Sequence, residues 1–346
     1  MGKTTEWPQL SDEELLQFRI CDLGLTLESP EIQERVGQLY AELAAKEQVF
    51  RPHIYLGDEW FSPEGMLAIS IPFYLAHPRL KALEKRMMLE VEGGTPEWFQ
   101  RLLRHEAGHC FDHTYRFSKR RKWQKIFGSP DEEYAPETYH PKPYSKSFVQ
   151  HLDNWYAQAH PDEDFAETFA VWLGCDADSA IDWRKQYRNW PGALQKLEYI
   201  EELAQEAKTL RPFRTRGNLP CMAIKSKMTL QRYYARRKKE NATDYPDFYD
   251  GDLKNIFNGE QSLNKKEFGA ARFLKRRHKS IVDSVSFWSG EKKFPIETLI
   301  KKFVARCETL DLRIGKSEED TLLNLSAYLA TLVNHYLFTG KFKRSV

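Results

Sequence analysis

The 346-residue chain lacks any long hydrophobic run: no stretch approaches the about 18 uncharged apolar residues that mark a membrane-spanning helix. Residues 1–8 also lack an apolar stretch of signal-peptide length. These two absences argue against an integral membrane protein and against a secreted one. We therefore expect no membrane partner.

Cysteine is scarce as well. The five cysteines are odd in number and far apart in the sequence, and no two show the C-x-x-C spacing of a structural zinc ribbon. Isolated cysteines of this kind are typical of proteins whose thiols stay reduced. We therefore expect a cytoplasmic protein without structural disulfides.

The chain as a whole has no large excess of charge of either sign, since its net charge is +2 at pH 7. That total conceals two oppositely charged parts. Residues 1–211 hold 25 basic and 35 acidic side chains, a net charge of −10, whereas residues 212–346 hold 27 basic and 15 acidic ones, a net charge of +12. A basic part of this kind could bind nucleic acid, another anionic partner or the acidic part of the same chain.

Two basic runs, residues 236–239 and residues 275–279, concentrate that positive charge on expected helices. No nucleic-acid reader motif, such as a zinc finger, accompanies them. The alternative interpretation is that each run is an ordinary solvated helix face. Both interpretations stay open on the sequence alone.

The most informative segment that is present reads His-Glu-Ala-Gly-His at residues 105–109. Residues four apart lie on the same face of a helix, so His105 and His109 can bind one metal ion. Glu106 would then reach a water molecule held on that ion. The pattern predicts a zinc site that carries its own general base.

The flanking residues predict the helix that such a site needs, over residues 95–117. Thr95 suits the N-cap and Pro96 the first helical position, and apolar residues follow at helical spacing. Gly108 costs about 1 kcal/mol relative to alanine inside a helix, which predicts close approach by another element. Cys110 falls on the apolar stripe, so we expect it to be a buried small side chain rather than a ligand.

A catalytic zinc site generally needs a third protein ligand and leaves its fourth position to water. His113 is the nearest candidate, but it lies roughly 12 Å from His105 along a helix axis that rises 1.5 Å per residue. One ion cannot join both imidazoles on an unbroken helix. We therefore exclude His113.

A better donor is expected on a second, short helix over residues 161–173. Pro161, an acidic first turn, apolar residues and a closing Gly174 predict this helix. Glu163 and Glu167 lie one turn apart, so one carboxylate can bind zinc while the other accepts the free ring N–H of a ligating histidine. The alternative is that the acidic first turn only complements the helix dipole.

The motif at residues 105–109 and the segment Glu-Asp-Phe-Ala-Glu at residues 163–167 together resemble the gluzincin metallopeptidases. The resemblance is to the lethal-factor-like branch and to the bacterial proteins named putative zinc-binding metallopeptidases. It implies one catalytic Zn²⁺ bound by His105, His109 and Glu163, with Glu167 beside the ligands. It also implies a functional tyrosine seven residues before the third ligand, which is Tyr156 in this sequence.

The chemistry implied is hydrolysis of peptide bonds by a zinc-activated water, with Glu106 as the general base. Tyr156 would donate a hydrogen bond to the oxyanion that forms on the substrate. The alternative for Tyr156 is an aromatic side chain that only packs beside Trp155. The implied substrate is a peptide or protein. No motif in this sequence indicates which peptide bond would be cleaved.

Before the motif, residues 53–56 and 66–71 predict two strands joined through a turn at residues 62–65. In gluzincins a substrate peptide pairs with an edge strand beside the active-site helix, so residues 68–73 are a candidate for that edge. The alternative is a strand that only completes a small sheet. Between the ligand segments, residues 118–147 predict a long, Pro- and Tyr-rich loop that shapes a cleft.

We therefore predict an α+β, mostly helical fold with two domains. Residues 1–211 would form a gluzincin-like zinc metallopeptidase domain with a small sheet and an active-site helix. Residues 212–346 would form a basic helical domain, with apolar stripes that begin at Ile296 and Leu322. The rival class is a zinc-containing binding or regulatory protein whose basic C-terminal half engages nucleic acid.

Overall fold

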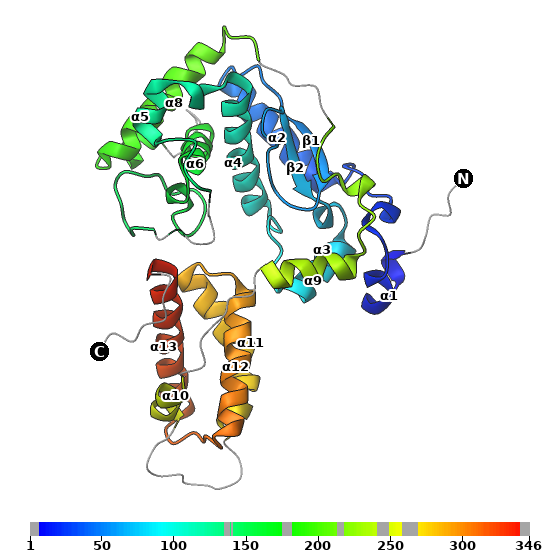
Figure 1. Cartoon of the computed structure of the whole chain (residues 1–346), viewed down its shortest axis with the longest axis vertical. Coiled ribbons are helices and arrows are strands. Elements are labelled where there is room, and N and C mark those ends of the chain that lie inside the picture. Colours follow the sequence, from blue (N-terminus) through cyan, green and yellow to red (C-terminus); the bar gives the residue numbers. More distant parts are fainter. Residues whose placement is uncertain are drawn as a thin grey trace. The chain divides into compact units, whose positions relative to one another are not determined.

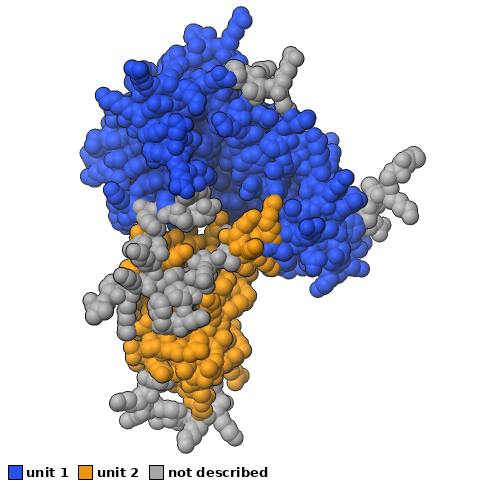
Figure 2. All heavy atoms as spheres, viewed as in Figure 1, with its two compact units in different colours: residues 1–87, 91–235 blue, residues 88–90, 236–346 orange. Residues whose placement is uncertain are grey.

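The computed structural model describes residues 7–134, 139, 141–174, 182–212, 218–240, 249–257 and 269–339. The chain divides into two compact units, coloured separately in Figure 2: unit 1 is residues 1–87 and 91–235, and unit 2 is residues 88–90 and 236–346. The described ranges contain thirteen α-helices and one two-stranded sheet (Figure 1). The mostly helical α+β class predicted from the sequence is confirmed.

Helix α4 (Pro96–Tyr115) lies at the centre of unit 1, between the small sheet and helix α6 (Pro161–Leu173) (Figure 1). Both helices begin where the sequence predicts. The Thr95 hydroxyl caps α4 by accepting the N–H of Trp98 at 3.3 Å. The Nδ1 atom of His160 caps α6 by accepting the N–H of Asp162 at 3.2 Å.

Gly108 explains how closely α4 and α6 pack. A Cβ atom added to this residue would lie 2.7 Å from the Cα atom and 2.8 Å from the carbonyl oxygen of Ala166 in α6. Only a residue without a side chain allows the two backbones to approach so closely. The predicted packing reason for Gly108 is therefore confirmed, and the contact sets residues 105–109 against residues 163–167.

The sheet consists of β1 (His53–Gly57) and β2 (Ala68–Pro72), both at predicted positions. The strands run parallel, with Ile54 opposite Ile69. The connection through residues 58–67 therefore returns the chain to the starting end of the sheet instead of forming a tight hairpin. All five residues of β2 are buried.

The outer edge of β2 is already paired within the protein. The N–H of Ser70 donates to the carbonyl of Phe61 at 2.8 Å, and the carbonyl of Ala68 accepts from the Cys110 thiol at 3.3 Å. The N–H of Ser70 therefore cannot also pair with a substrate peptide. The prediction that residues 68–73 offer a free edge is wrong at Ser70.

The predicted loop over residues 118–147 is wrong in its first part, where helix α5 (Arg121–Phe127) forms. Two aromatic side chains of α5 are buried and pack on Phe165 of α6: the ring centroids of Trp123 and Phe127 lie 5.8 and 5.3 Å from that of Phe165. This long-range burial stabilises α5, which precedes the Pro- and Tyr-rich part of the segment. Residues 135–138 and 140 of the predicted loop lie outside the described residues.

Six further α-helices begin in unit 1. They are α1 (Asp12–Leu16), α2 (Pro30–Ala45), α3 (Pro78–Met88), α7 (Trp183–Gln186), α8 (Pro191–Ala207) and α9 (Leu230–Glu240). Four of the five cysteines lie in the described residues, and none of these four forms a disulfide.

The chain beyond the predicted boundary at residue 211 continues to pack with unit 1. The N–H of Ile20 donates to the carbonyl of Met228 at 3.0 Å, and the N–H of Leu230 donates to that of Phe18 at 2.9 Å. Residues 213–217, just beyond that boundary, lie outside the described residues. The division into a peptidase domain and a basic domain at residue 211 stays a prediction.

The described residues of unit 2 include four α-helices that pack around one apolar core. They are α10 (Asp250–Phe257), α11 (Ala270–Ser289), α12 (Lys293–Thr309) and α13 (Glu318–Thr339). The apolar stripes predicted from Ile296 and Leu322 lie on α12 and α13, where Phe303 and Leu329 are fully buried. None of the helices within the described ranges is both long and apolar enough to cross a membrane.

The basic run on α11 has acidic partners within unit 2. Lys275 pairs with Glu308 at 2.7 Å, and both Arg276 and Arg277 pair with Glu318. Exposed pairs of this kind contribute about 0–1 kcal/mol each to stability. They nevertheless offset part of the positive charge that the sequence displays.

Candidate metal centre

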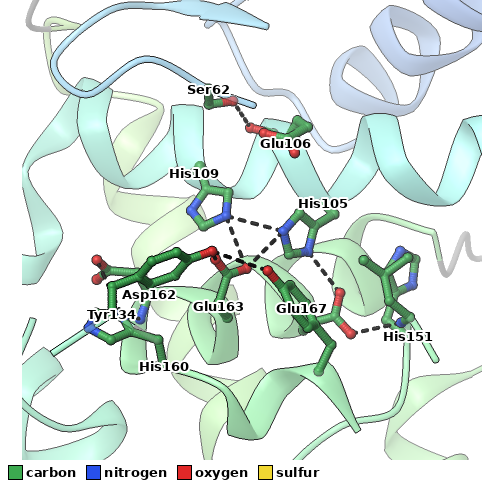
Figure 3. Close-up of polar contacts among 12 residues, drawn as sticks. Ser62, His105, Glu106, His109, Tyr134, His151, His160, Asp162, Glu163 and Glu167 are labelled. Atoms are coloured by element: carbon green, nitrogen blue, oxygen red, sulfur yellow. Dashed lines mark hydrogen bonds and ion pairs between the residues drawn. The ribbon is translucent and has the colours of Figure 1, made fainter. Parts of the chain in front are cut away.

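Helices α4 and α6 bring three ligand-type atoms around one point (Figure 3). The Nε2 atom of His105 lies 3.1 Å from Nε2 of His109 and 3.0 Å from Oε2 of Glu163. The Nε2 atom of His109 lies 3.4 Å from the same Glu163 oxygen. These are the three residues that the sequence analysis selects as metal ligands, and the structure brings all three together.

The separations fit a bound zinc ion. With zinc–ligand distances of about 2.0–2.2 Å, the ligand atoms of a tetrahedral site lie roughly 3.4 Å apart. The Oε2 atom of Glu163 is buried and has no hydrogen-bond partner among the described residues. A buried carboxylate oxygen that faces two imidazole nitrogens suits a cation, and two histidines with one glutamate are a catalytic zinc set with one position open.

Glu167 orients the first of these imidazoles. Its Oε1 atom lies 2.8 Å from Nδ1 of His105, and its Oε2 atom accepts the N–H of Leu152 at 2.7 Å. Since the carboxylate accepts the Nδ1 hydrogen, Nε2 is the nitrogen of His105 that faces the cluster, and it can bind a metal ion that displaces its proton. Glu167 thus lies beside His105, one of the three predicted ligands.

The surroundings shift the pKa values of these groups in different directions. Burial alone would raise the pKa of Glu163, but the nearby His109 and His105 hold it well below its usual value. Burial would lower the pKa of His105, but Glu163 and Glu167 raise it well above its usual value. The carboxylate at residue 163 therefore stays ionised, as a metal ligand requires.

Glu106 is buried beside the same cluster. Burial raises the pKa of its carboxyl group, and the charges of His105 and His109 only partly offset that rise. Its Oε2 atom has no hydrogen-bond partner among the described residues. The hydroxyl of Ser62 donates to the backbone carbonyl of Glu106 at 2.8 Å.

Two tyrosines lie at the other side of the cluster. The ring of Tyr156, which begins the 3-10 helix η5 (Tyr156–Gln158), has its centroid 5.7 Å from that of His105. The hydroxyl of Tyr134 donates to Oε1 of Glu163 at 2.8 Å and lies 3.2 Å from the hydroxyl of Tyr156. Burial, and then the charge of Glu163, raise the pKa of both phenols.

Tyr134 was missed by the sequence analysis. It lies in a span that contains several tyrosines, and no spacing rule links it to residues 105–109 or to Glu163. The only available signal was the tyrosine-rich composition of the segment between the ligands. That signal does not single out one residue.

His113, excluded as a ligand from the sequence, stays outside the trio. Its ring stacks on that of His109, with centroids 6.2 Å apart and an interplanar angle of 26°. Burial and the neighbouring His109 lower the pKa of His113 to about 4. A neutral, packed imidazole is consistent with a structural role.

Residues 100–203 match the sequence model of a family described as putative zinc-binding metallo-peptidase. No curated protein and no solved structure matches the chain. The matched segment contains His105, His109 and Glu163, so the residues that converge in the structure lie inside the part that is similar to this family.

Proposed function

We propose that the protein is a zinc-dependent metallopeptidase of the gluzincin type. The observation that carries the proposal is the convergence of His105, His109 and Glu163 around one point, with Glu167 fixing the orientation of His105. The family similarity of residues 100–203 supports it independently.

Each residue of the centre has a separate task. A zinc ion bound there would lower the pKa of a water molecule from about 15.7 towards 7 and polarise a substrate carbonyl. Glu106 accepts the proton of the attacking water and later returns it to the leaving amine. The raised pKa of Glu106 favours that return at neutral pH.

Tyr156 completes the proposed mechanism by donating a hydrogen bond to the oxyanion that forms on the substrate carbonyl. Such a donor is worth about 3–4 kcal/mol in other acyl-transfer sites. The raised pKa of its phenol keeps the hydrogen available at neutral pH. The proposed substrate is a peptide or a protein.

The test is a peptide-library cleavage assay on the zinc-loaded protein. We expect cleavage that a chelator abolishes and added zinc restores. Glu106→Gln should bind zinc normally and lose turnover, because an amide cannot accept the proton. The matched control is Glu97→Gln, an exposed change on the same helix, which should leave both unchanged. Retained turnover in zinc-loaded Glu106→Gln would remove the proposed base.

The alternative, a zinc-containing protein whose basic half binds nucleic acid, gains no support from unit 2. Three residues of the run at 275–279 pair with acidic side chains there. Salt-sensitive DNA or RNA binding without peptide cleavage would favour this alternative over the peptidase.

A further inference from the structure

We infer that Tyr134 is a positioning residue of the metal centre: it holds Glu163 by one carboxylate oxygen and links that ligand to Tyr156. The inference rests on the proposed function, since it concerns how this chain prepares its own residues for zinc. It assigns a role to a residue that no motif in the sequence selects.

The carboxylate of Glu163 has a different partner on each oxygen. Oε1 accepts the hydrogen of the Tyr134 hydroxyl at 2.8 Å, whereas Oε2 faces the Nε2 atoms of His105 and His109 at 3.0 and 3.4 Å (Figure 3). A carboxylate can rotate about its last bond and exchange its two oxygens. The bond from Tyr134 opposes that rotation and reserves Oε1, so that a single oxygen is presented to the metal.

The direction of the hydrogen bond between the Tyr134 and Tyr156 hydroxyls follows from the number of hydrogens that each phenol carries. A phenol has one hydrogen to donate, and that of Tyr134 goes to Glu163. Without substrate, the 3.2 Å contact between the two hydroxyls therefore uses the hydrogen of Tyr156, with Tyr134 as the acceptor. Tyr156 would turn that hydrogen from Tyr134 to the oxyanion when a substrate reacts. Tyr134 thus places the proposed oxyanion donor and the third ligand in one chain of hydrogen bonds.

The ring of Tyr134 is held although it is not part of the core. Its side chain is 54 % exposed, but its ring packs edge-on against His160, with centroids 5.4 Å apart. His160 is itself fixed, because Nδ1 accepts the N–H of Asp162 and Nε2 lies 3.1 Å from the carbonyl of Glu132. Replacing the exposed phenol should therefore cost the fold little, and its loss should act mainly on the metal centre.

The test compares Tyr134→Phe with Tyr139→Phe. Tyr139 lies in the same segment, and its ring also packs near Tyr156, but its hydroxyl donates to the backbone carbonyl of Asn154 at 2.7 Å. We expect Tyr134→Phe to weaken zinc binding about 10–100-fold, as the loss of a partner to a ligand typically does. Tyr139→Phe should bind zinc as the unchanged protein does.

The measurement is competition for zinc with a chromophoric chelator, made on the full chain. Thermal unfolding of the chelator-treated variants comes first, and equal midpoints would show that neither change acts through the fold. The effect of Tyr134→Phe is then measured again in a protein that already carries Glu163→Ala. There, Tyr134→Phe should have no further effect, because the carboxylate through which it acts is gone.

Two outcomes would overturn the inference: unchanged zinc affinity in Tyr134→Phe, or an equal loss with and without the Glu163 carboxylate. Both are distinct from failure of the proposed function. If the unchanged protein bound no zinc and cleaved no peptide, the peptidase proposal itself would fall.

Discussion

The Nδ1 atom of His105 lies 2.8 Å from Oε1 of Glu167, and the residues are 62 positions apart in the sequence. This one contact joins α4 to α6 through a buried, polar pair. It decides which nitrogen of His105 carries the hydrogen, and therefore which nitrogen can bind a metal.

Removal of that contact should weaken the metal centre. We expect Glu167→Ala to lower zinc affinity about 10–100-fold, because His105 loses the partner that fixes its ring. The zinc affinity of Glu167→Gln should lie between those of the unchanged protein and Glu167→Ala. The amide oxygen can still accept from Nδ1 of His105, but the amide nitrogen would face the N–H of Leu152. Chelator competition measures the zinc affinity of both variants. Unchanged affinity in Glu167→Ala would show that the contact contributes only to the stability of the fold.

Tyr156→Phe should reduce turnover without changing substrate binding. A hydrogen bond that forms only as the oxyanion develops contributes to kcat, and KM should stay nearly constant. From the usual value of one such donor, we expect kcat to fall about 100–1000-fold. Steady-state kinetics on a cleaved peptide measure this, and a rise in KM at constant kcat would make Tyr156 a binding residue instead.

Gly108→Ala should destabilise unit 1. The added methyl group would meet the Ala166 backbone at 2.7 Å, which cannot move as a flexible side chain can. Overpacking of this kind costs about 1–3 kcal/mol, more than the gain of about 1 kcal/mol that alanine brings to a helix. Gly37→Ala in α2 is the matched control, because nothing lies within 4 Å of its added Cβ.

The two glycine variants should therefore have opposite effects in denaturant unfolding. Gly37→Ala should be stabilising by up to about 1 kcal/mol. Gly108→Ala should also lower zinc affinity, since it forces α4 away from α6 and from Glu163. Stability equal to or above that of the unchanged protein would contradict the tight packing.

Unfolding should become easier as the pH falls from neutral towards 4. Burial lowers the pKa of His151 to about 4 from its usual 6.5, even though Glu167 acts in the opposite direction. Between pH 6.5 and pH 4 the unfolded chain therefore binds a proton at His151 that the folded chain does not bind. The stability that neutral His151 contributes is present above pH 6.5 and is lost as the pH falls below it. The free energy of unfolding should fall by roughly 3 kcal/mol between pH 6.5 and pH 4 through this group.

His151→Gln tests that prediction, because an amide does not titrate and can still donate to the carbonyl of Arg101 that faces Nε2 of His151. The free energy of unfolding, measured from pH 7 to pH 4 with zinc absent, should fall less steeply in the variant. Identical pH profiles would show that other groups account for acid sensitivity.

Local signals in the sequence predicted the elements that carry the site. Thr95 and Pro96 define the start of α4, Pro161 and the acidic first turn define that of α6, and the helical period places His105 and His109 on one face. Gly108 predicted a close neighbour without naming it. Each of these predictions depends on residues within one or two turns of one another.

The features that were missed depend on contacts between distant residues. The pairing of Ser70 with Phe61 closes the edge of β2, and the burial of Trp123 against Phe165 stabilises α5. The hydrogen bond from Tyr134 to Glu163 joins two segments whose separation follows no repeat. Such contacts are set by packing of the whole unit and leave no periodic pattern in the chain.

The two helices that supply the ligands also define a ring in the chain. An ion shared by His109 and Glu163 would act as a cross-link that encloses α5, Tyr134 and Tyr156. Loops of this length, about 55 residues, lose roughly 4 kcal/mol of unfolded-state entropy when a covalent link closes them. Metal binding would thus stabilise the chain segment between its own ligands. Removal of the ion should lower the stability of the segment that carries both tyrosines.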